Sequence, residues 1–323
     1  MQLYPLKFQP LSKEKIWGGT HLNRIANHQS ANSQIGETWD VSALEDNDSE
    51  VTNGFLAENT LSELLEVYMS DLVGDKTYSL HGNNFPLLIK LIDATDKLSV
   101  QVHPNDEMAQ DNGERNGKTE MWYVLEADEN AEIILGFNKE VTKEELEERL
   151  KNQTVSEILN YQNVEKGDVV FIPAGTVHAI GKGCMMLEVQ QASDTTYRLY
   201  DYDRLQSNGQ PRELHTQQAF EAIDYKNWEH TVNHPSGVEE IEELVDCDYF
   251  TCNLLRFNQP KTYDISDIDS MVLLSAVEGS VEISHEEGKI ILQRGETTLI
   301  PAIINTLTII PEGEAKLLET YIK

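Results

Sequence analysis

The chain is 323 residues long, and at roughly 100–200 residues per domain this length predicts two domains. Its 56 Asp and Glu residues outnumber its 25 Lys and Arg residues, which gives a formal charge of −31. A surface this acidic repels phosphate backbones and anionic lipid headgroups, so we expect no nucleic-acid partner and no membrane partner.

The cysteines and the N-terminus indicate the cellular compartment. Cys184, Cys247 and Cys252 form no CxxC pair, which argues against a disulfide framework and against a thiolate zinc site. The first residues lack the apolar segment of a signal peptide, and no run of about 18 apolar residues occurs in the chain. We therefore expect a cytoplasmic globular protein.

Short apolar or alternating runs bounded by turn residues predict strands along the first two thirds of the chain. Closely spaced strands of this kind favour a sandwich or barrel of antiparallel β-structure, so the predicted fold class is mainly β. The predicted strands span residues 85–92, 98–102, 121–126, 132–136, 169–173 and 186–190.

Three segments begin with Thr-x-x-Glu, the pattern of a capping box at the start of a helix. They begin at Thr60, Thr142 and Thr154. Because they form two groups within a strand-rich chain, we interpret them as helical insertions on the first of two β-domains.

An internal repeat indicates that the β-domain is duplicated. Residues 167–174 read GDVVFIPA and residues 295–302 read GETTLIPA. In both copies a Gly-acid turn precedes a short strand that ends at Ile-Pro-Ala. With the acidic, proline-containing stretch 233–243 as the junction, the predicted domains are 1–235 and 236–323.

The first copy of the repeat continues to a histidine. Gly167 and Gly175 permit tight turns and Pro173 ends the strand, so His178 follows directly after a hairpin corner. A histidine on a strand is more often a hydrogen-bonded structural residue than a metal ligand. As long as His178 is considered by itself, that structural alternative stays open.

Polar residues elsewhere form a possible donor set together with His178. Period-2 alternation places Ser99, Gln101 and His103 on one face of a strand. Lys118 and Glu120 form a second same-face polar pair, at the start of another strand. Inside a barrel, Gln101, His103, Glu120 and His178 would present two imidazole nitrogens and two oxygens. This set suits a divalent transition metal, zinc first, with Gln101 its least usual member.

Arg198 and Arg204 are two of the few cations in an acidic chain, and they lie in a charged segment. They either pair with surface carboxylates or handle an anionic or oxyanion-forming substrate. Spacing alone leaves both possibilities open. The nearby acids are Asp194, Asp201 and Asp203.

These motifs together resemble class I mannose-6-phosphate isomerases of the short bacterial form, a branch of the cupins. The Gly-x5-Pro-x-Gly-x2-His run looks like the second cupin metal motif. The resemblance implies two cupin-type (jelly-roll) β-sandwich domains. The matching stretches are KIWGG (15–19), GETWDVS (36–42), FPLLIKLIDATDKLSVQVHPND (85–106), GKTEMWYV (117–124), GDVVFIPAGTVHAIG (167–181) and QQASDTTYRLYDYDR (190–204).

The resemblance also implies roles for residues at the matching positions. It places one Zn²⁺ per chain on Gln101, His103, Glu120 and His178, and it makes Arg198 the catalytic arginine. Glu188 is then the first candidate for proton transfer, and Lys118 is the second. The implied substrate-binding residues are Lys90, Ser99 and Asp194.

The implied activity is a zinc-dependent aldose–ketose isomerisation between mannose 6-phosphate and fructose 6-phosphate through an enediolate. The expected partner is thus a small phosphosugar, and no obligate protein partner is implied. Two alternatives remain: a metal cupin isomerase for another phosphosugar, and a non-catalytic sugar-binding cupin.

The second copy of the repeat lacks the ligand pattern. Aligning the two copies places Thr306 at the position of His178 and Ile303 at the position of Gly175. We therefore expect the C-terminal domain to bind no metal and to stabilise the first domain.

Overall fold

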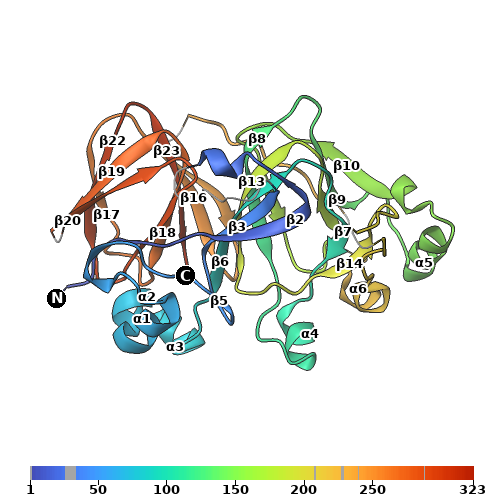
Figure 1. Ribbon diagram of the computed structural model, residues 1–323, viewed down its shortest axis with the longest axis horizontal. Helices are drawn as coiled ribbons and strands as arrows, with labels where there is room; N and C mark the ends of the chain where they lie inside the picture. The colour runs from blue at the N-terminus through green and yellow to red at the C-terminus, as the bar shows by residue number, and fades with distance from the viewer. Residues whose placement is uncertain (1, 26–33, 207–208, 227–228, 239, 287) are drawn as a thin grey trace.

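In the part of the chain that the structure describes, four larger β-sheets pack in a row, with short helices around them (Figure 1). The computed structural model describes residues 2–25, 34–206, 209–226, 229–238, 240–286 and 288–323. The sheets have five, six, six and four strands, and a small fifth sheet pairs β4 (Ala43–Leu44) with β5 (Asn47–Asp48). The prediction of a mainly β fold is confirmed.

The first pair of sheets contains every strand that the sequence predicts, each with bounds within two residues of the prediction. Neighbouring strands are antiparallel throughout. In spatial order, the five-stranded sheet consists of β10 (Leu159–Asn163), β9 (Glu132–Phe137), β12 (His178–Ile180), β7 (Val100–Val102) and β14 (Tyr197–Tyr200). The six-stranded sheet consists of β11 (Val169–Ile172), β8 (Glu120–Ala127), β13 (Cys184–Gln191), β6 (Leu87–Ala94), β3 (Ile35–Val41) and β2 (Leu11–Gly19).

The second pair of sheets comes from the C-terminal part of the chain, apart from one N-terminal strand. Its six-stranded sheet consists of β1 (Leu6–Lys7), β21 (Thr297–Ile300), β18 (Val272–Glu278), β23 (Ala315–Tyr321), β16 (Thr251–Phe257) and β15 (Ile241–Asp246). Its four-stranded sheet consists of β17 (Lys261–Asp264), β22 (Thr306–Pro311), β19 (Ser280–His285) and β20 (Gly288–Gln293). The division into 1–235 and 236–323 stays a prediction.

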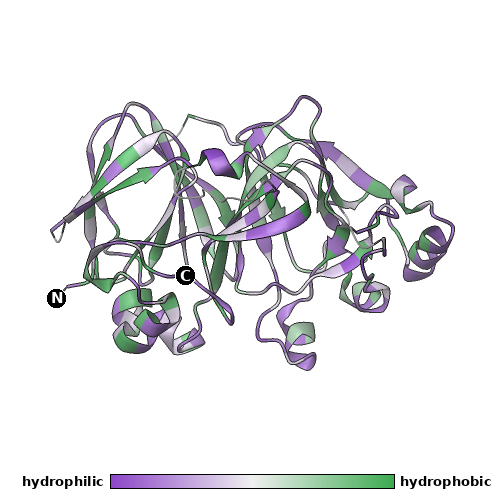
Figure 2. Ribbon diagram, viewed as in Figure 1, coloured by the Kyte–Doolittle hydropathy of each residue, from purple (hydrophilic) through white to green (hydrophobic). Residues whose placement is uncertain are grey.

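A continuous apolar core joins the two six-stranded sheets. Successive residues of a strand point to opposite faces, so Ile89 and Leu91 of β6 pack in one cluster with Leu273 of β18. Lys90, between them, points the other way, into the space between the first two sheets. Figure 2 shows the same division: strands at the centre of the molecule are largely hydrophobic, and the outer strand β2 is largely hydrophilic.

The helices are short and begin at recognisable caps. Thr60 forms the predicted capping box, and Thr142 accepts a hydrogen bond from the backbone N–H of Glu145. The helix predicted after Thr154 is wrong, because a single 3-10 turn leads there into β10, whose Leu159 is buried in the core. The helices are α1 (Leu61–Tyr68), α2 (Ser70–Val73), α3 (Asp75–His81), α4 (Asp106–Asp111), α5 (Lys143–Lys151) and α6 (Thr216–Ala222), with 3-10 turns η1 (Leu22–Arg24), η2 (Gly54–Leu56) and η3 (Val155–Glu157). None of the helices in the described ranges is long and apolar enough to cross a membrane.

Helices α1–α3 contact the C-terminal part of the chain, although they are inserted early in the sequence. The carbonyls of Leu72 and Val73 accept hydrogen bonds from the backbone N–H groups of Ala302 and Met271. The carboxylate of Asp269 accepts from two backbone N–H groups in the first turn of α3. The first helical insertion therefore packs against the second pair of sheets.

The internal repeat occupies matching places in the two halves. It forms β11 and β21, and the glycines before them, Gly167 and Gly295, both have positive φ, 97° and 83°. The alignment of Thr306 with His178 is wrong by one residue. Thr306 is exposed, whereas Leu307 is buried in the core and lies opposite Tyr263, as His178 lies opposite Gln101. Because the side-chain period of a strand is two, one extra residue before β22 turns Thr306 outward.

Candidate active site

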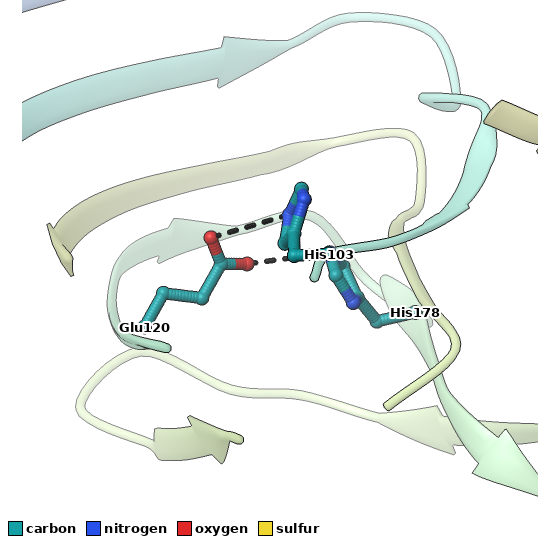
Figure 3. A group of neighbouring side chains, drawn as sticks. All are labelled: His103, Glu120 and His178. Carbon is teal, nitrogen blue, oxygen red and sulfur yellow. Dashed lines mark ion pairs between the residues drawn. The ribbon is translucent and has the colours of Figure 1, made fainter. Parts of the chain in front are cut away.

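Two histidines and a glutamate meet between the first two sheets (Figure 3). His178 begins β12, His103 follows β7, and Glu120 begins β8, so three strands supply one side chain each. One ligand atom from each residue lies within 4.8 Å of the others, and all three side chains are buried. Glu120 Oε1 lies 3.3 Å from His178 Nε2, and Glu120 Oε2 lies 3.5 Å from His103 Nε2.

Backbone carbonyls fix the protonation of both imidazoles. His103 Nδ1 donates to the carbonyl of Thr195 at 3.0 Å, and His178 Nδ1 donates to that of Thr176 at 2.9 Å. Burial, together with the charge of Lys118, holds the pKa of His103 well below its usual range, and burial lowers that of His178 to about 4. Both rings are therefore neutral at pH 7, and each unprotonated Nε2 lies within 3.5 Å of a carboxylate oxygen of Glu120.

This arrangement fits a bound cation. Two lone pairs and a carboxylate oxygen face one another, and Glu120 Oε1 is buried without a hydrogen-bond donor. A buried acceptor without a partner costs about 1–3 kcal/mol, which a cation at the centre of the cluster would relieve. Two imidazole nitrogens and a carboxylate oxygen are a common donor set for a catalytic zinc.

Gln101 lies beside this cluster. Its side-chain amide nitrogen is 3.3 Å from His178 Nε2, and its strand β7 pairs with β12 at this point. A half-turn of the amide group would present its oxygen in place of the nitrogen. Gln101 thus stands where a fourth protein donor would stand, and its role as a ligand stays a prediction.

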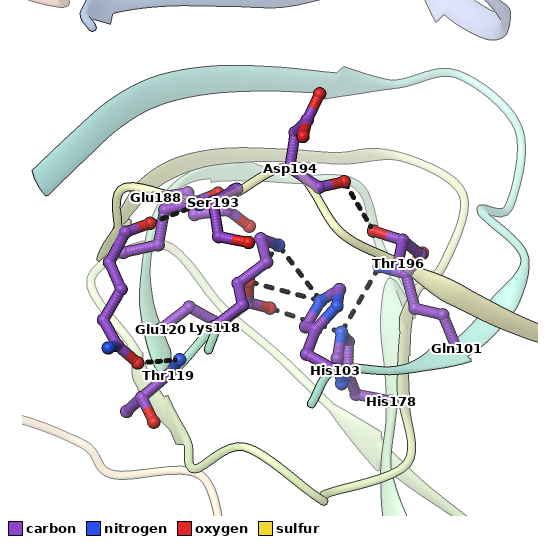
Figure 4. A network of polar contacts seen from close by, with 12 residues as sticks. Gln101, His103, Lys118, Thr119, Glu120, His178, Glu188, Ser193, Asp194 and Thr196 are labelled. Atoms are coloured by element: carbon purple, nitrogen blue, oxygen red, sulfur yellow. Dashed lines mark hydrogen bonds and ion pairs between the residues drawn. The ribbon is translucent and has the colours of Figure 1, made fainter. Parts of the chain in front are cut away.

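A buried chain of charges continues from Glu120 along the six-stranded sheet (Figure 4). Lys118 Nζ contacts Glu120 Oε2 and lies 3.0 Å from His103 Nε2. Burial alone would lower the pKa of Lys118, but Glu120 and Glu188 outweigh it, and the pKa lies above its usual value. Burial and the charge of Glu188 raise the pKa of Glu120 to about 7.

Glu188 occupies the centre of the sheet, on β13. Its Oε2 accepts a 2.8 Å hydrogen bond from Trp122 Nε1, and its Oε1 lies 3.2 Å from Lys90 Nζ. Lys90 also donates to Gln190 Oε1 at 2.6 Å. Burial opposes the charge of Glu188, but Lys118 and Lys90 outweigh that effect and hold its pKa down at about 2. Glu188 is therefore ionised in the interior of the protein.

Arg198 lies across the space from Glu188, on β14. Its Nε donates to Ser99 Oγ at 3.3 Å and its Nη1 to the carbonyl of Glu213 at 2.7 Å. The carboxylate of Asp201 pairs with Arg204 and Arg212 instead. Arg204 therefore pairs with a carboxylate, which is the structural alternative given above. Arg198 does not, because its guanidinium donates hydrogen bonds to a hydroxyl and a carbonyl.

Seven of the ten predicted site residues line one cleft of about 230 Å³, and the buried residues His103, Glu120 and His178 are not among those that line it. Ser99 is buried in its wall, whereas the side chain of Asp194 is exposed at the rim. The residues that line it include Lys15, Glu37, Trp39, Lys90, Ser99, Gln101, Lys118, Trp122, Glu188, Asp194, Arg198 and Arg212.

Comparison with known proteins identifies the family. A family model described as the catalytic domain of type I phosphomannose isomerase matches residues 5–139, and one described as the cupin domain of mannose-6-phosphate isomerase matches residues 240–322. The mannose-6-phosphate isomerase ManA of Bacillus subtilis is 41% identical over 310 residues, which cover 93% of this chain and 94% of that protein. The chain belongs to the type I mannose-6-phosphate isomerase family.

Further members of the family agree over nearly the whole chain. A mannose-6-phosphate isomerase of Streptococcus mutans is 34% identical, covering 94% of both proteins. A crystal structure of the mannose 6-phosphate isomerase from Bacillus subtilis superposes with a TM-score of 0.89 at 34% identity, covering 99% of this chain and 100% of that one. The predicted family and the predicted cupin fold are confirmed.

Sequence reasoning assigned no role to several residues at the cleft or in contact with its side chains, among them Trp122, Gln190 and Arg212. Trp122 and Gln190 stand two residues after Glu120 and Glu188, so period-2 alternation places them on the same faces and could have identified them. Arg212 lies outside every motif, in a segment between β14 and α6, and only the folded chain brings it to the cleft.

Proposed function

We propose that this member of the family interconverts mannose 6-phosphate and fructose 6-phosphate with one bound Zn²⁺ per chain. The observation that carries the proposal is a cluster of two neutral imidazoles and Glu120 that contacts Lys118. Lys118 lines a cleft together with Arg198 and Glu188. The relatives named mannose-6-phosphate isomerase support the substrate.

His103, Glu120 and His178 would hold the metal, with Gln101 as the fourth ligand. The interaction of each Nδ1 with a carbonyl orients the rings and keeps Nε2 available. When bound, zinc supplies Lewis-acid stabilisation of negative charge on a substrate oxygen.

Isomerisation moves a proton between C1 and C2 of the sugar, through an enediolate. Glu188 is our first candidate for the group that carries this proton, because it is ionised and Trp122 fixes its position. Its low pKa means that it holds a proton only briefly before returning it to the neighbouring carbon. Lys118 is the second candidate.

Arg198 would stabilise the charge that develops on the substrate oxygens. Its contacts to Ser99 and to the carbonyl of Glu213 fix the guanidinium before substrate arrives, and such preorganised donors contribute most when charge develops in the transition state. Ser99, Lys90 and Asp194 would contact the substrate or orient its hydroxyls.

We also infer a cytoplasmic location. Two points support this location. Cys184, Cys247 and Cys252 are free thiols. The proposed substrate, a sugar phosphate, is an intracellular metabolite.

Metal analysis combined with activity tests the proposal. The purified chain should contain about one zinc per polypeptide and convert mannose 6-phosphate to fructose 6-phosphate in a coupled assay. Chelation should remove both the zinc and the activity, and added zinc should restore them. A zinc-loaded chain that binds the sugar phosphate but does not isomerise it would contradict the proposal and favour a non-catalytic sugar-binding protein.

A further inference from the structure

One buried carboxylate at the mouth of the cleft holds two arginines. Asp201 follows β14, and its Oδ2 accepts a 2.7 Å hydrogen bond from Arg212 Nε. Its Oδ1 accepts from Arg212 Nη2 and from Arg204 Nη2. Arg204 also donates to the carbonyl of Lys97. The guanidinium of Arg204 is thus held by groups of the protein and does not line the cleft, whereas Arg212 does.

The backbone brings the two arginines back to the same carboxylate. Tyr202 and Asp203 both have positive φ, 56° and 55°, so the chain reverses sharply directly after Asp201. A backbone bridge between Leu205 and Pro211 then returns the chain and delivers Arg212. Non-glycine residues in this conformation are uncommon, and a strained turn beside a cleft is typical of a functional site.

The neighbouring backbone keeps Arg212 close to Arg198. The N–H of His215 donates to the carbonyl of Arg198, and the N–H of Arg198 donates to Nδ1 of His215. The chain segment that carries Arg212 therefore runs beside β14, and Arg198 and Arg212 both line the cleft.

Each of these two guanidinium groups has a donor to spare. Arg212 uses Nε and Nη2 for Asp201, and Arg198 uses Nε and Nη1 for Ser99 and Glu213. Within the described part of the chain, Nη1 of Arg212 and Nη2 of Arg198 have no protein partner.

The positive charge of each lysine that lines the cleft is balanced by a carboxylate of its own. Each lies against a carboxylate within 3.2 Å: Lys15 against Glu37, Lys90 against Glu188, and Lys118 against Glu120. Arg212 shares the carboxylate of Asp201 with Arg204. Among the described residues Arg198 pairs with no carboxylate, so a dianion entering the cleft finds excess positive charge beside the arginines and not beside the lysines.

We propose that Arg212, positioned by Asp201, binds the phosphate group of the substrate and makes the site select a sugar phosphate over the neutral sugar. A guanidinium fixed on one side by a carboxylate presents its remaining N–H groups to phosphate oxygens in a preorganised geometry. Ser99 and Arg198 line the same cleft as Arg212, and Arg198 lies opposite Gln101, which is beside the candidate metal cluster. The assignment deepens the proposed isomerase function and rests on it for the identity of the sugar.

Steady-state kinetics and calorimetry test this role. Arg212→Gln should raise KM for mannose 6-phosphate by about 10-fold or more, the effect of losing one charged hydrogen bond, with kcat within a few-fold of wild type. The Kd for inorganic phosphate, measured by titration calorimetry on the zinc-loaded protein, should weaken by a similar factor. Asp201→Asn should raise KM in the same direction, and the melting temperature of each variant checks its fold.

Arg149→Gln is the matched control, because Arg149 pairs with Glu157 on the surface beside α5, away from the cleft. It should leave KM and phosphate affinity unchanged. If Arg212→Gln leaves both KM and the phosphate Kd at wild-type values, the assignment is wrong. A wild-type protein that binds phosphate through Arg212 but does not isomerise the sugar would refute the isomerase proposal and leave the phosphate site standing.

Discussion

At the scale of single residues, the site depends on which atoms carry protons. The same Nδ1–carbonyl contacts that make each imidazole neutral also turn both Nε2 atoms toward Glu120. If these residues bind zinc as proposed, removing one histidine would remove a ligand, and the remaining donors would not retain the metal tightly.

His103→Ala and His178→Ala should therefore each lose the bound zinc and the isomerase activity. Metal content per chain, measured together with kcat/KM, checks the expectation. His285→Ala is the control, because His285 lies in β19 of the second pair of sheets, and it should retain both. Wild-type zinc content in His178→Ala would show that the ligand assignment is wrong.

Arg198 should matter to the rate more than to binding of the metal. Arg198→Ala removes a preorganised donor that does not belong to the metal cluster, so we expect zinc content and fold to persist while kcat falls by about 10²-fold or more. The measurement is kcat on protein with verified zinc content. Activity within a few-fold of wild type would return Arg198 to a structural role.

At the scale of elements, six strands of the first pair of sheets were predictable because alternation and turn residues are local signals. The helix predicted after Thr154 failed because Leu159 is buried in the core as part of β10, and tertiary pairing overrode a local capping pattern. Most of the candidate site was predictable because its residues lie in strand motifs of the family. The place of Arg212 in the cleft was not predictable from the sequence. Arg212 lies in a loop without a recognisable motif, and only the folded chain brings it to Asp201.

Among the described residues, the second pair of sheets repeats the strand pairing of the first pair without a counterpart of the His103–Glu120–His178 cluster. Glu319 lies opposite Asn253 and Leu274 in β16 and β18, as Glu188 lies opposite Lys90 and Trp122 in β6 and β8. Apolar residues fill the matching ligand positions: Leu307 for His178, Ile265 for His103 and Val272 for Glu120. We therefore expect Thr306→Ala to leave zinc content and kcat/KM near wild type. A second equivalent of tightly held zinc that disappears in Thr306→Ala would contradict this reading.

Glu319 should contribute to stability and not to catalysis. Its oxygens accept hydrogen bonds from Tyr263 Oη at 2.6 Å and Asn253 Nδ2 at 2.9 Å, and its side chain is buried. Glu319→Ala leaves two donors without a partner, so the free energy of unfolding should fall by about 2 kcal/mol or more. Denaturant unfolding measures the loss, and kcat/KM at a temperature where the variant is folded should match wild type. Stability equal to wild type would show that water satisfies both donors.

At the scale of the whole molecule, the two halves share their core. Ile89 and Leu91 from the first pair of sheets pack in the same cluster as Leu273 and Leu318 from the second. The N-terminal strand β1 pairs with β21, and helices α2 and α3 form hydrogen bonds with the C-terminal part. The face of the first half that points away from the candidate site is therefore an interior surface.

Truncation should reveal this dependence. A chain that ends at Val238 loses every strand of the second pair except β1, and it exposes the apolar face of β6, β8 and β13 to water. Because large contiguous apolar faces drive association, we expect the truncated protein to aggregate, with loss of the monodisperse peak in size-exclusion chromatography. A chain that ends at Ile322 is the control: it loses only Lys323, which pairs with Asp246 near the surface, and it should behave as wild type. A truncated chain that remained monodisperse, with full zinc content and kcat/KM, would mean that the first half folds on its own and that the shared core is dispensable.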